Sequence, residues 1–383
     1  MRTIGVVTVA RSDYGIYRPI LRRIRLHPEL RLSLLVSGMH LSPEFGMTAR
    51  AIEVDGFEIA ERVEMLVASD SPEAIAKSMG LGLIGFGQVY ARRRPDILVV
   101  LGDRFEMHAA ALAALPFNIP LAHIHGGETT EGAIDEALRH SLTKMAHLHF
   151  VSTKAYAKRV VQMGEEPWRV TVSGAPGLDN LNETTLLRPA EIEEQLGVKV
   201  TRPWLLVTYH PVTLEAEDTG AHVASLCAAL DECGLPVVFT YPNADTCGRV
   251  VLDGIRRYVD AHEDSRLFTS LGTVTYLSLM KHTTAMAGNS SSGIIEAASF
   301  GLPVVNIGNR QRGRLRAGNV IDVGYGRDDI RRGIERALLR EFRASLEGLE
   351  NPYGDGRASE RIVSQLACVP LDRALLMKRF RDE

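Results

Sequence analysis

The sequence has few cysteines: Cys227, Cys233, Cys247 and Cys368 are the only ones in 383 residues, and no two of them form a CxxC pair. This spacing does not indicate a metal motif or a disulfide framework, and free thiols in a reducing compartment fit it better. The apolar run near the N-terminus is too short for a signal peptide. No run of about 18 apolar residues is present that could span a membrane. We therefore expect a cytoplasmic protein without a membrane partner.

An excess of positive charge is also missing, because the formal net charge is −3 at pH 7. Proteins that bind nucleic acid usually carry a basic patch, so we expect no nucleic-acid partner. The chain lacks a GxGxxG fingerprint, and we therefore do not predict a nicotinamide cofactor. What is present is the composition of a globular protein, with 45% hydrophobic and 24% charged residues. The length suffices for two domains of ordinary size.

Apolar runs of strand length alternate with helical patterns, which predicts parallel sheets covered by helices on both faces. The predicted strands of the first half are 3–9, 32–36, 96–101, 119–124 and 148–151. After a linker and a short helix the predicted strands are 204–208, 236–240, 266–268, 284–287 and 303–307. The predicted fold is α/β, with two Rossmann-like, doubly wound parallel-sheet domains that face a cleft. We place these domains at 1–178 and 185–356, and we expect a C-terminal helix within about 357–383 to pack back on the first.

Titratable side chains crowd residues 123–139, between a predicted strand and a helical pattern. The candidate site residues of this segment are His125, Glu128, Asp135, Glu136 and Arg139. Open α/β sheets keep their chemistry at the carboxyl ends of the strands, so we interpret the cluster as catalytic. The alternative is a surface loop with solvated acids.

Two other strands of the first half also end in charged residues. Arg11 and Asp13 follow the first strand, where backbone N–H groups and a guanidinium suit a phosphate, although Asp13 can instead cap the helix. Asp103 and Arg104 follow the third predicted strand, where the carboxylate can act as a base or bind a sugar hydroxyl. Asp103 and Glu106 have the spacing of a capping box, which explains Glu106 without a function.

The second half carries a loop rich in glycine and serine directly after a predicted strand. Residues 288–296 contain Ser290, Ser291 and Ser292, followed by Glu296 about one helical turn later. Hydroxyl and N–H groups at a helix start favour an anion, and Glu296 can accept both hydroxyls of a ribose. The alternative is an N-cap in a serine-rich loop.

Polar residues follow other strands of the second half as well. His210 ends the first of them, and Asn243 and Asp245 follow the second. Arg310 and Arg314 follow the last predicted strand and add positive charge near the same edge. The alternatives here are a structural histidine and an ordinary turn.

Taken together, these strings resemble the hydrolysing UDP-N-acetylglucosamine 2-epimerases, which open sialic acid synthesis. Similar bacterial enzymes act on bacillosamine-type nucleotide sugars on the way to legionaminic acid. The resemblance runs from about residue 6 to 362, and its specific strings are 11–14, 38–41, 102–106, 123–140, 210–212, 242–245, 288–296 and 310–314. It implies a glycosyltransferase-B-like fold, a homodimer or homotetramer, a UDP-sugar substrate, and neither a cofactor nor a metal.

The resemblance also implies roles for residues. In the first domain the predicted catalytic residues are Asp103, His125, Asp135, Glu136, Arg11 and His40, and further substrate contacts are predicted for Asp13, Arg104, Glu128 and Arg139. In the second domain UDP is expected to contact His210, Asn243, Asp245, Ser290, Ser291, Ser292, Glu296, Arg310 and Arg314. His125 departs from the family, because we expect a glutamate there in the animal enzyme. A histidine can also carry a proton near neutral pH.

The family reaction eliminates UDP across C1 and C2 to give a 2-acetamidoglucal, and water then adds with inversion at C2. The products are N-acetylmannosamine and UDP. UDP-2,4-diacetamido-2,4,6-trideoxyglucose (UDP-diacetylbacillosamine) is the alternative substrate, because no residue of the sequence indicates which substituents the sugar carries at C4 and C6. Three other functions compete with this one: a non-hydrolysing 2-epimerase, a glycosyltransferase and a non-catalytic nucleotide-sugar sensor. The string His-Ile-His-Gly-Gly-Glu argues against the first, and a glycosyltransferase would not need the acid cluster.

Overall fold

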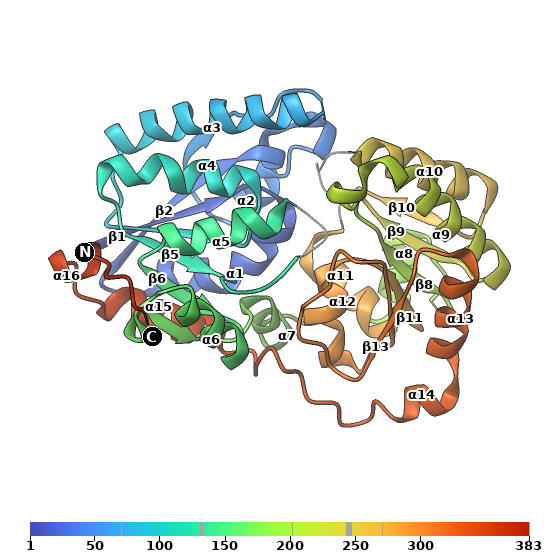
Figure 1. The fold of residues 1–383 in the computed structure, drawn as a ribbon. Coiled ribbons are helices and arrows are strands. Elements are labelled where there is room, and N and C mark those ends of the chain that lie inside the picture. Colours follow the sequence, from blue (N-terminus) through green and yellow to red (C-terminus); the bar gives the residue numbers. More distant parts are fainter. Residues whose placement is uncertain (70, 131–133, 201, 243–246, 270, 383) are drawn as a thin grey trace. The chain divides into compact units, whose positions relative to one another are not determined.

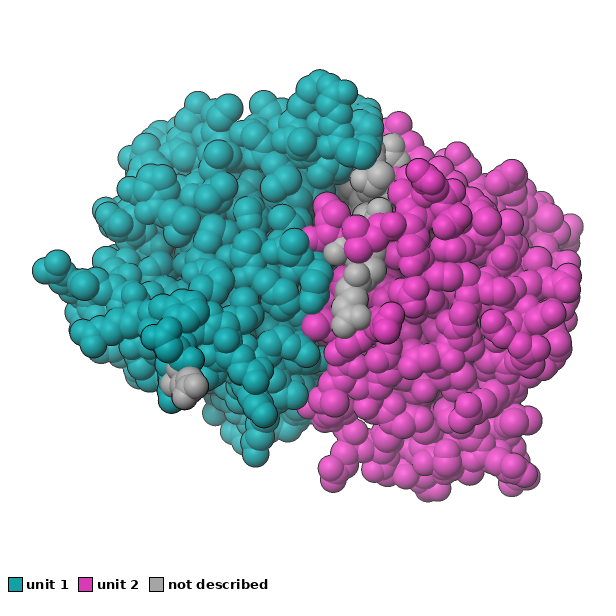
Figure 2. Space-filling view, in the orientation of Figure 1, with its two compact units in different colours: residues 1–128, 135–183, 353–383 teal, residues 129–134, 184–352 magenta. Residues whose placement is uncertain are grey.

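The computed structural model describes residues 1–69, 71–130, 134–200, 202–242, 247–269 and 271–382. The chain divides into two compact units (Figure 1; Figure 2). Unit 1 comprises residues 1–128, 135–183 and 353–383, and unit 2 comprises residues 129–134 and 184–352. Each unit contains one parallel sheet with helices around it, which confirms the predicted α/β fold class.

The sheet of unit 1 has seven strands in the order β3-β2-β1-β4-β5-β6-β7, and all neighbouring pairs are parallel. The strands are β1 (Arg2–Thr8), β2 (Leu30–Ser37), β3 (Ile59–Val63), β4 (Ile97–Leu101), β5 (Leu121–Ile124), β6 (Leu148–Val151) and β7 (Val170–Val172). Every residue of β4, β5 and β6 is buried. Burial on both faces explains why the inner strands are continuous apolar runs in the sequence.

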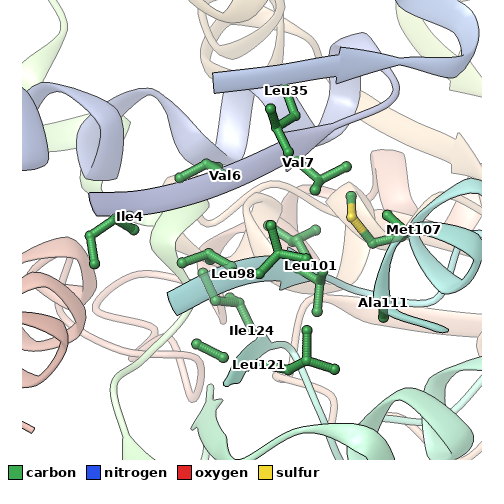
Figure 3. Close-up of a cluster of buried hydrophobic side chains, with 14 of the residues drawn as sticks. Ile4, Val6, Val7, Leu35, Leu98, Leu101, Met107, Ala111, Leu121 and Ile124 are labelled. Atoms are coloured by element: carbon green, nitrogen blue, oxygen red, sulfur yellow. The ribbon is translucent and has the colours of Figure 1, made fainter. Parts of the chain in front are cut away.

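The helices of unit 1 are α1 (Arg11–Leu26), α2 (Ala49–Val54), α3 (Pro72–Arg92), α4 (Phe105–Ala114), α5 (Asp135–Met145), α6 (Lys154–Gln162), α7 (Asp179–Glu183), α15 (Ala358–Cys368) and α16 (Arg373–Leu376). Met107 and Ala111 of α4 lie in the core beside Leu101 of β4 (Figure 3). None of the described helices of the chain is long and apolar enough to cross a membrane.

The sheet of unit 2 has six strands in the order β10-β9-β8-β11-β12-β13, again all parallel. The strands are β8 (Leu205–Thr208), β9 (Val237–Thr240), β10 (Arg266–Phe268), β11 (Ala285–Gly288), β12 (Val304–Ile307) and β13 (Val320–Val323). The helices are α8 (Pro189–Leu196), α9 (Thr219–Cys233), α10 (Gly248–Ala261), α11 (Gly272–His282), α12 (Ser291–Ile295), α13 (Arg327–Leu338) and α14 (Arg340–Ala344).

Three strands, β3, β7 and β13, were not predicted from the sequence. Each of them is an edge strand: β3 and β7 border the first sheet, and β13 borders the second, whose other edge strand, β10, was predicted. Outer strands are covered less completely, and exposed polar residues such as Asp322 in β13 interrupt the apolar pattern. The missing signal therefore has a physical cause, because an edge strand need not be apolar on both faces.

Candidate active site

A buried histidine–glutamate pair lies at the carboxyl end of β5. The Nδ1 atom of His125 is 2.5 Å from Oε1 of Glu128, and the hydroxyl of Ser152 donates to the same oxygen at 2.8 Å. Because the carboxylate accepts from Nδ1, Nε2 is the ring nitrogen that can take up or release a proton. The arrangement resembles a base oriented by a carboxylate, as proton-transfer sites require.

The turn that carries this pair has an unusual backbone. His125 has φ +65°, a left-handed conformation that residues other than glycine seldom adopt. Gly127 follows with φ +75°, and a Cβ there would lie 2.7 Å from the carbonyl oxygen of Tyr156. Strain of this kind is often found at functional sites and is held in place by the surrounding structure.

Asp103, at the end of β4, forms an ion pair with Arg139 of α5. Arg139 also donates from Nη1 to the carbonyl oxygen of His125 at 2.9 Å. The Arg139 side chain is 2% exposed and the Asp103 side chain is 19% exposed, so Asp103 is the more accessible partner. Arg139 therefore connects the ends of β4 and β5.

The capping box predicted for Asp103 and Glu106 is wrong. Helix α4 begins at Phe105, and its N-cap is Arg104, without a side-chain cap. Glu106 instead accepts from Nε and Nη2 of Arg104 at 3.2 and 2.9 Å. Glu106, two residues further along the chain, is thus a carboxylate partner of Arg104.

His40 is placed by two threonines. Its Nε2 lies 2.9 Å from the hydroxyl of Thr8, and its Nδ1 lies 2.7 Å from that of Thr48. Burial, together with the nearby positive charges of Arg104 and Arg11, lowers the pKa of His40 to about 3. With both nitrogens in hydrogen bonds and the ring neutral, His40 is better suited to positioning neighbours than to proton transfer.

Asp13 holds the turn between β1 and α1. Its two carboxylate oxygens accept from the N–H groups of Val9 and Ala10 at 2.8 and 2.7 Å. Burial raises the pKa of Asp13 to about 6, while the backbone hydrogen bonds act in the opposite direction. These contacts favour the capping alternative for Asp13. Arg11 is the first residue of α1, directly beside this turn.

Asp135 and Glu136, also predicted as catalytic, form the first turn of α5. Glu136 accepts from Nε2 of His140 one turn later, at 2.9 Å. Its side chain is 28% exposed, unlike the buried Glu128. The sequence prediction of the cluster had not included Ser152, the residue after β6 that binds Glu128. Its position at the carboxyl end of the neighbouring strand was the signal that could have identified it.

In unit 2, polar residues gather at the carboxyl ends of β8, β11 and β12. Ser290 is the N-cap of α12, and its hydroxyl accepts from the N–H of Ser292 at 3.3 Å. Ser291 begins this helix, and Glu296 follows its last residue. Helix α12 has five residues, so its dipole alone is a weak attraction for an anion.

Arginines of the loop after β12 are held by backbone carbonyl groups. Nη1 of Arg310 donates to the carbonyl of Asn289 at 3.1 Å, and Asn289 in turn bonds to the backbone of His210. Nε of Arg314 donates to the carbonyl of Thr129 at 2.9 Å, a contact within unit 2. The sequence prediction did not include Asn289. Asn243 and Asp245, which it did include, lie outside the described residues.

The sequence and fold of the chain match a known family. Residues 22–367 match the family described as UDP-N-acetylglucosamine 2-epimerase. UDP-N,N'-diacetylbacillosamine 2-epimerase (hydrolyzing) of Legionella pneumophila is 38% identical over 99% of both chains. GDP/UDP-N,N'-diacetylbacillosamine 2-epimerase (hydrolyzing) of Campylobacter jejuni is also 38% identical, over 100% of this chain and 99% of that protein.

A solved structure has the same fold. The UDP-GlcNAc 2-epimerase of Neisseria meningitidis, bound to UDP-GlcNAc, superposes with a TM-score of 0.82 at 19% identity, over 96% of this chain and 99% of that chain. At this identity the likeness shows the fold, and the sequence relatives show the family. The chain belongs to the UDP-N-acetylglucosamine 2-epimerase family.

Proposed function

We propose that this chain is a hydrolysing 2-epimerase that acts on a UDP-linked 2-acetamido sugar. The observation that carries the proposal is the buried His125–Glu128 pair at the end of β5, on a strained turn, with the Asp103–Arg139 pair at the neighbouring strand end. A glycosyltransferase or a binding protein would not require groups that can exchange protons there. The names of the relatives at 38% identity support the same reaction.

The proposed reaction has two steps, and neither needs a cofactor. A base removes the proton at C2 while the bond from C1 to the diphosphate oxygen breaks, which leaves a C1=C2 double bond and UDP. Water then adds its hydroxyl to C1, and an acid delivers a proton to C2 on the opposite face. The product is the free 2-epimeric sugar. The C2 proton is not acidic by itself, so departure of UDP must accompany its removal.

In this proposal unit 1 exchanges the protons. His125, Asp103 and Asp135 are the candidate base and acid, with Glu136 in reserve. Arg11 and Arg104 stabilise the charge that develops on the departing diphosphate, because guanidinium groups bind phosphate oxygens in a fixed geometry. The contacts of Asp13 and His40 support a role in holding these neighbours in place.

Unit 2 binds the nucleotide in this proposal. Ser290, Ser291 and Ser292 donate to the phosphates, and Glu296 accepts from the ribose hydroxyls. His210, Asn243, Asp245, Arg310 and Arg314 complete the set. Since α12 is short, the hydroxyls and Arg310 supply most of the attraction for the diphosphate.

UDP-N-acetylglucosamine and UDP-diacetylbacillosamine are the two candidate substrates. The two relatives at 38% identity are named for diacetylbacillosamine, and this favours the second sugar. Initial rates on both substrates, with equal enzyme and free UDP as the readout, decide between them. A kcat/KM higher for UDP-N-acetylglucosamine would reverse the preference.

Incubation in deuterated water tests the elimination. The product should carry one deuterium at C2, because the second step takes its proton from the solvent. A product without deuterium at C2 would exclude the route. A UDP-linked product would instead identify a non-hydrolysing 2-epimerase, and UDP-sugar binding without release of UDP would identify a sensor.

A homodimer or homotetramer and a cytoplasmic location remain predictions, and sedimentation analysis tests the first.

A further inference from the structure

A buried asparagine after β11 joins the strand ends of unit 2. Oδ1 of Asn289 accepts from the N–H of His210 at 2.7 Å, and Nδ2 donates to the carbonyl of His210 at 2.8 Å. The backbone N–H of Asn289 donates to the carbonyl of Thr208 at 3.1 Å. The side chain thus continues the β8–β11 pairing beyond its last backbone pair, Thr208 and Gly288.

The backbone carbonyl of Asn289 binds the next strand end. It accepts from Nη1 of Arg310 at 3.1 Å and from Nε2 of Gln311 at 2.7 Å. Both donors belong to the loop after β12. Asn289 therefore connects the ends of β8, β11 and β12. Its side chain is fully buried.

An asparagine is suited to this position by its chemistry. Gly288 has φ +131°, and a Cβ there would lie 2.0 Å from the carbonyl oxygen of Thr208, so the backbone approaches β8 closely only with glycine. The next side chain must then satisfy one N–H and one C=O of His210. A planar amide offers one acceptor and one donor at the required spacing, whereas a carboxylate offers only acceptors.

We propose that Asn289 is a positioning residue for nucleotide binding, which sets the places of His210 and Arg310. The inference rests on the proposed function, in which these two residues contact UDP. Groups that are already in place lose little conformational freedom on binding, so their orientation contributes to affinity. Loss of Asn289 therefore weakens UDP binding, although its side chain is buried away from the ligand.

The test compares Asn289→Ala with a matched control, Asn319→Ala. Asn319 is also fully buried in unit 2, and its Nδ2 donates to the carbonyl of Leu302 at 2.8 Å. It lies before β13, at the opposite end of the sheet from Asn289. Calorimetry should show UDP binding weakened by roughly 10- to 100-fold in Asn289→Ala, the loss expected when one or two hydrogen bonds between UDP and the misplaced residues no longer form. In Asn319→Ala the affinity for UDP should fall by less than about twofold.

Melting temperatures separate positioning from a general loss of stability. Both variants should melt at lower temperature than the wild type, while only Asn289→Ala loses UDP affinity. UDP binding at wild-type strength in folded Asn289→Ala, or an equal loss in both variants, overturns the proposal. Should Asn289→Ala not fold, Asn289→Ser replaces it, since a hydroxyl can keep one of the two bonds, and the same outcomes apply.

A second readout does not depend on the proposed function. The ring resonances of His210, followed by NMR in the ligand-free protein and assigned with His210→Gln, should move in Asn289→Ala and stay in Asn319→Ala. Unmoved His210 resonances overturn the positioning role even if UDP affinity falls. Wild-type protein that binds UDP without releasing it from a UDP-sugar contradicts the proposed function and leaves the role of Asn289 standing.

Discussion

At the scale of single residues, the hydrogen bond between His125 and Glu128 constrains the chemistry most. It selects the ring nitrogen that faces away from the carboxylate for proton exchange. The partner of His125 is Glu128, three residues further along the chain. The carboxylate in turn accepts a hydrogen bond from Ser152, so two residues, Glu128 and Ser152, orient the imidazole of His125.

We predict that His125→Gln lowers kcat by roughly two to four orders of magnitude, the range that general acid–base groups contribute. The variant should bind UDP with unchanged affinity, because the proposed nucleotide contacts are made by other residues. Glu128→Gln keeps the size of the side chain but removes its charge, and it should lower kcat less. Steady-state kinetics and calorimetry on the same preparations measure both effects.

A structural histidine would behave differently. His125→Gln would then melt at lower temperature while its rate per folded molecule and its pH–rate profile matched the wild type. That result would remove His125 from the proton-exchange groups.

Asp103→Asn should also lose turnover, by roughly two to four orders of magnitude. Asn and Asp are equally good N-cap residues, so a residue that only capped a helix could be exchanged without loss of activity. Asp103 is not the N-cap of α4, and this reason for unchanged activity therefore does not apply. The change removes the negative charge opposite the buried Arg139. The folded state should therefore also lose about 1–3 kcal/mol of unfolding free energy in urea titrations. Full activity in Asp103→Asn would show that the carboxylate takes no part in the reaction.

At the scale of elements, the short helix α12 and the loop before it form the proposed nucleotide cradle. Removing Ser291 and Glu296 together, as Ser291→Ala with Glu296→Ala, should weaken UDP binding by about 1–3 kcal/mol for each lost hydrogen-bonded group. Calorimetry with UDP measures the loss. Ser299→Ala, further along the same segment, provides the control, because the hydroxyl of Ser299 is bonded to Asn351. Equal UDP affinities in the double variant and the control would refute the cradle.

The C-terminal segment is the second element with a clear physical role. Arg169 donates to the carbonyls of Leu375 and Ala374, both at 2.8 Å. Lys378 donates to the carboxylate of Glu165 at 2.8 Å and to the carbonyl of Ala146 at 2.6 Å. Buried donors and acceptors of unit 1 are thus satisfied by the end of the chain.

Deletion of residues 371–383 should therefore lower the melting temperature of the protein. Each buried group left without its partner costs about 1–3 kcal/mol. Deletion of only residues 382–383 keeps all of these contacts and serves as the control in differential scanning calorimetry. Identical melting temperatures of the two truncations would contradict the proposed role of the segment.

At the scale of the whole molecule, buried histidines make the stability depend on pH. Burial lowers the pKa of His40 and of His123 to about 3, and that of His147 to about 4. Below the ordinary value of 6.5 the unfolded chain takes up protons that the folded chain does not. The stabilisation is thus present above pH 6.5 and is lost as the pH falls toward the folded values.

We therefore predict that the urea midpoint falls between pH 7 and pH 5. Each histidine that stays neutral contributes on the order of 1 kcal/mol per pH unit in this range. Asp13 acts in the opposite direction, because burial raises its pKa to about 6, so its stabilisation is complete below 3.8 and is lost as the pH rises through about 6. Three histidines outweigh one aspartate. A midpoint that stays constant or rises from pH 7 to pH 5 would contradict the prediction.

Local patterns in the sequence predicted the fold class, the inner strands and the strand ends at which polar residues gather. Continuous apolar runs record burial on both faces, and polar residues directly after them record the carboxyl edge of a parallel sheet. This local information sufficed to identify Asp103, His125 and Ser290 as candidates.

Which of these residues contact each other could be seen only in the folded chain. Arg139 reaches Asp103 from 36 positions along the chain, and Asn289 reaches His210 across 79. Such pairings depend on strand order, which no local pattern records. The outer strands β3, β7 and β13 appeared only in the structure for a related reason. An edge strand is held by pairing with its neighbour and needs no apolar run of its own.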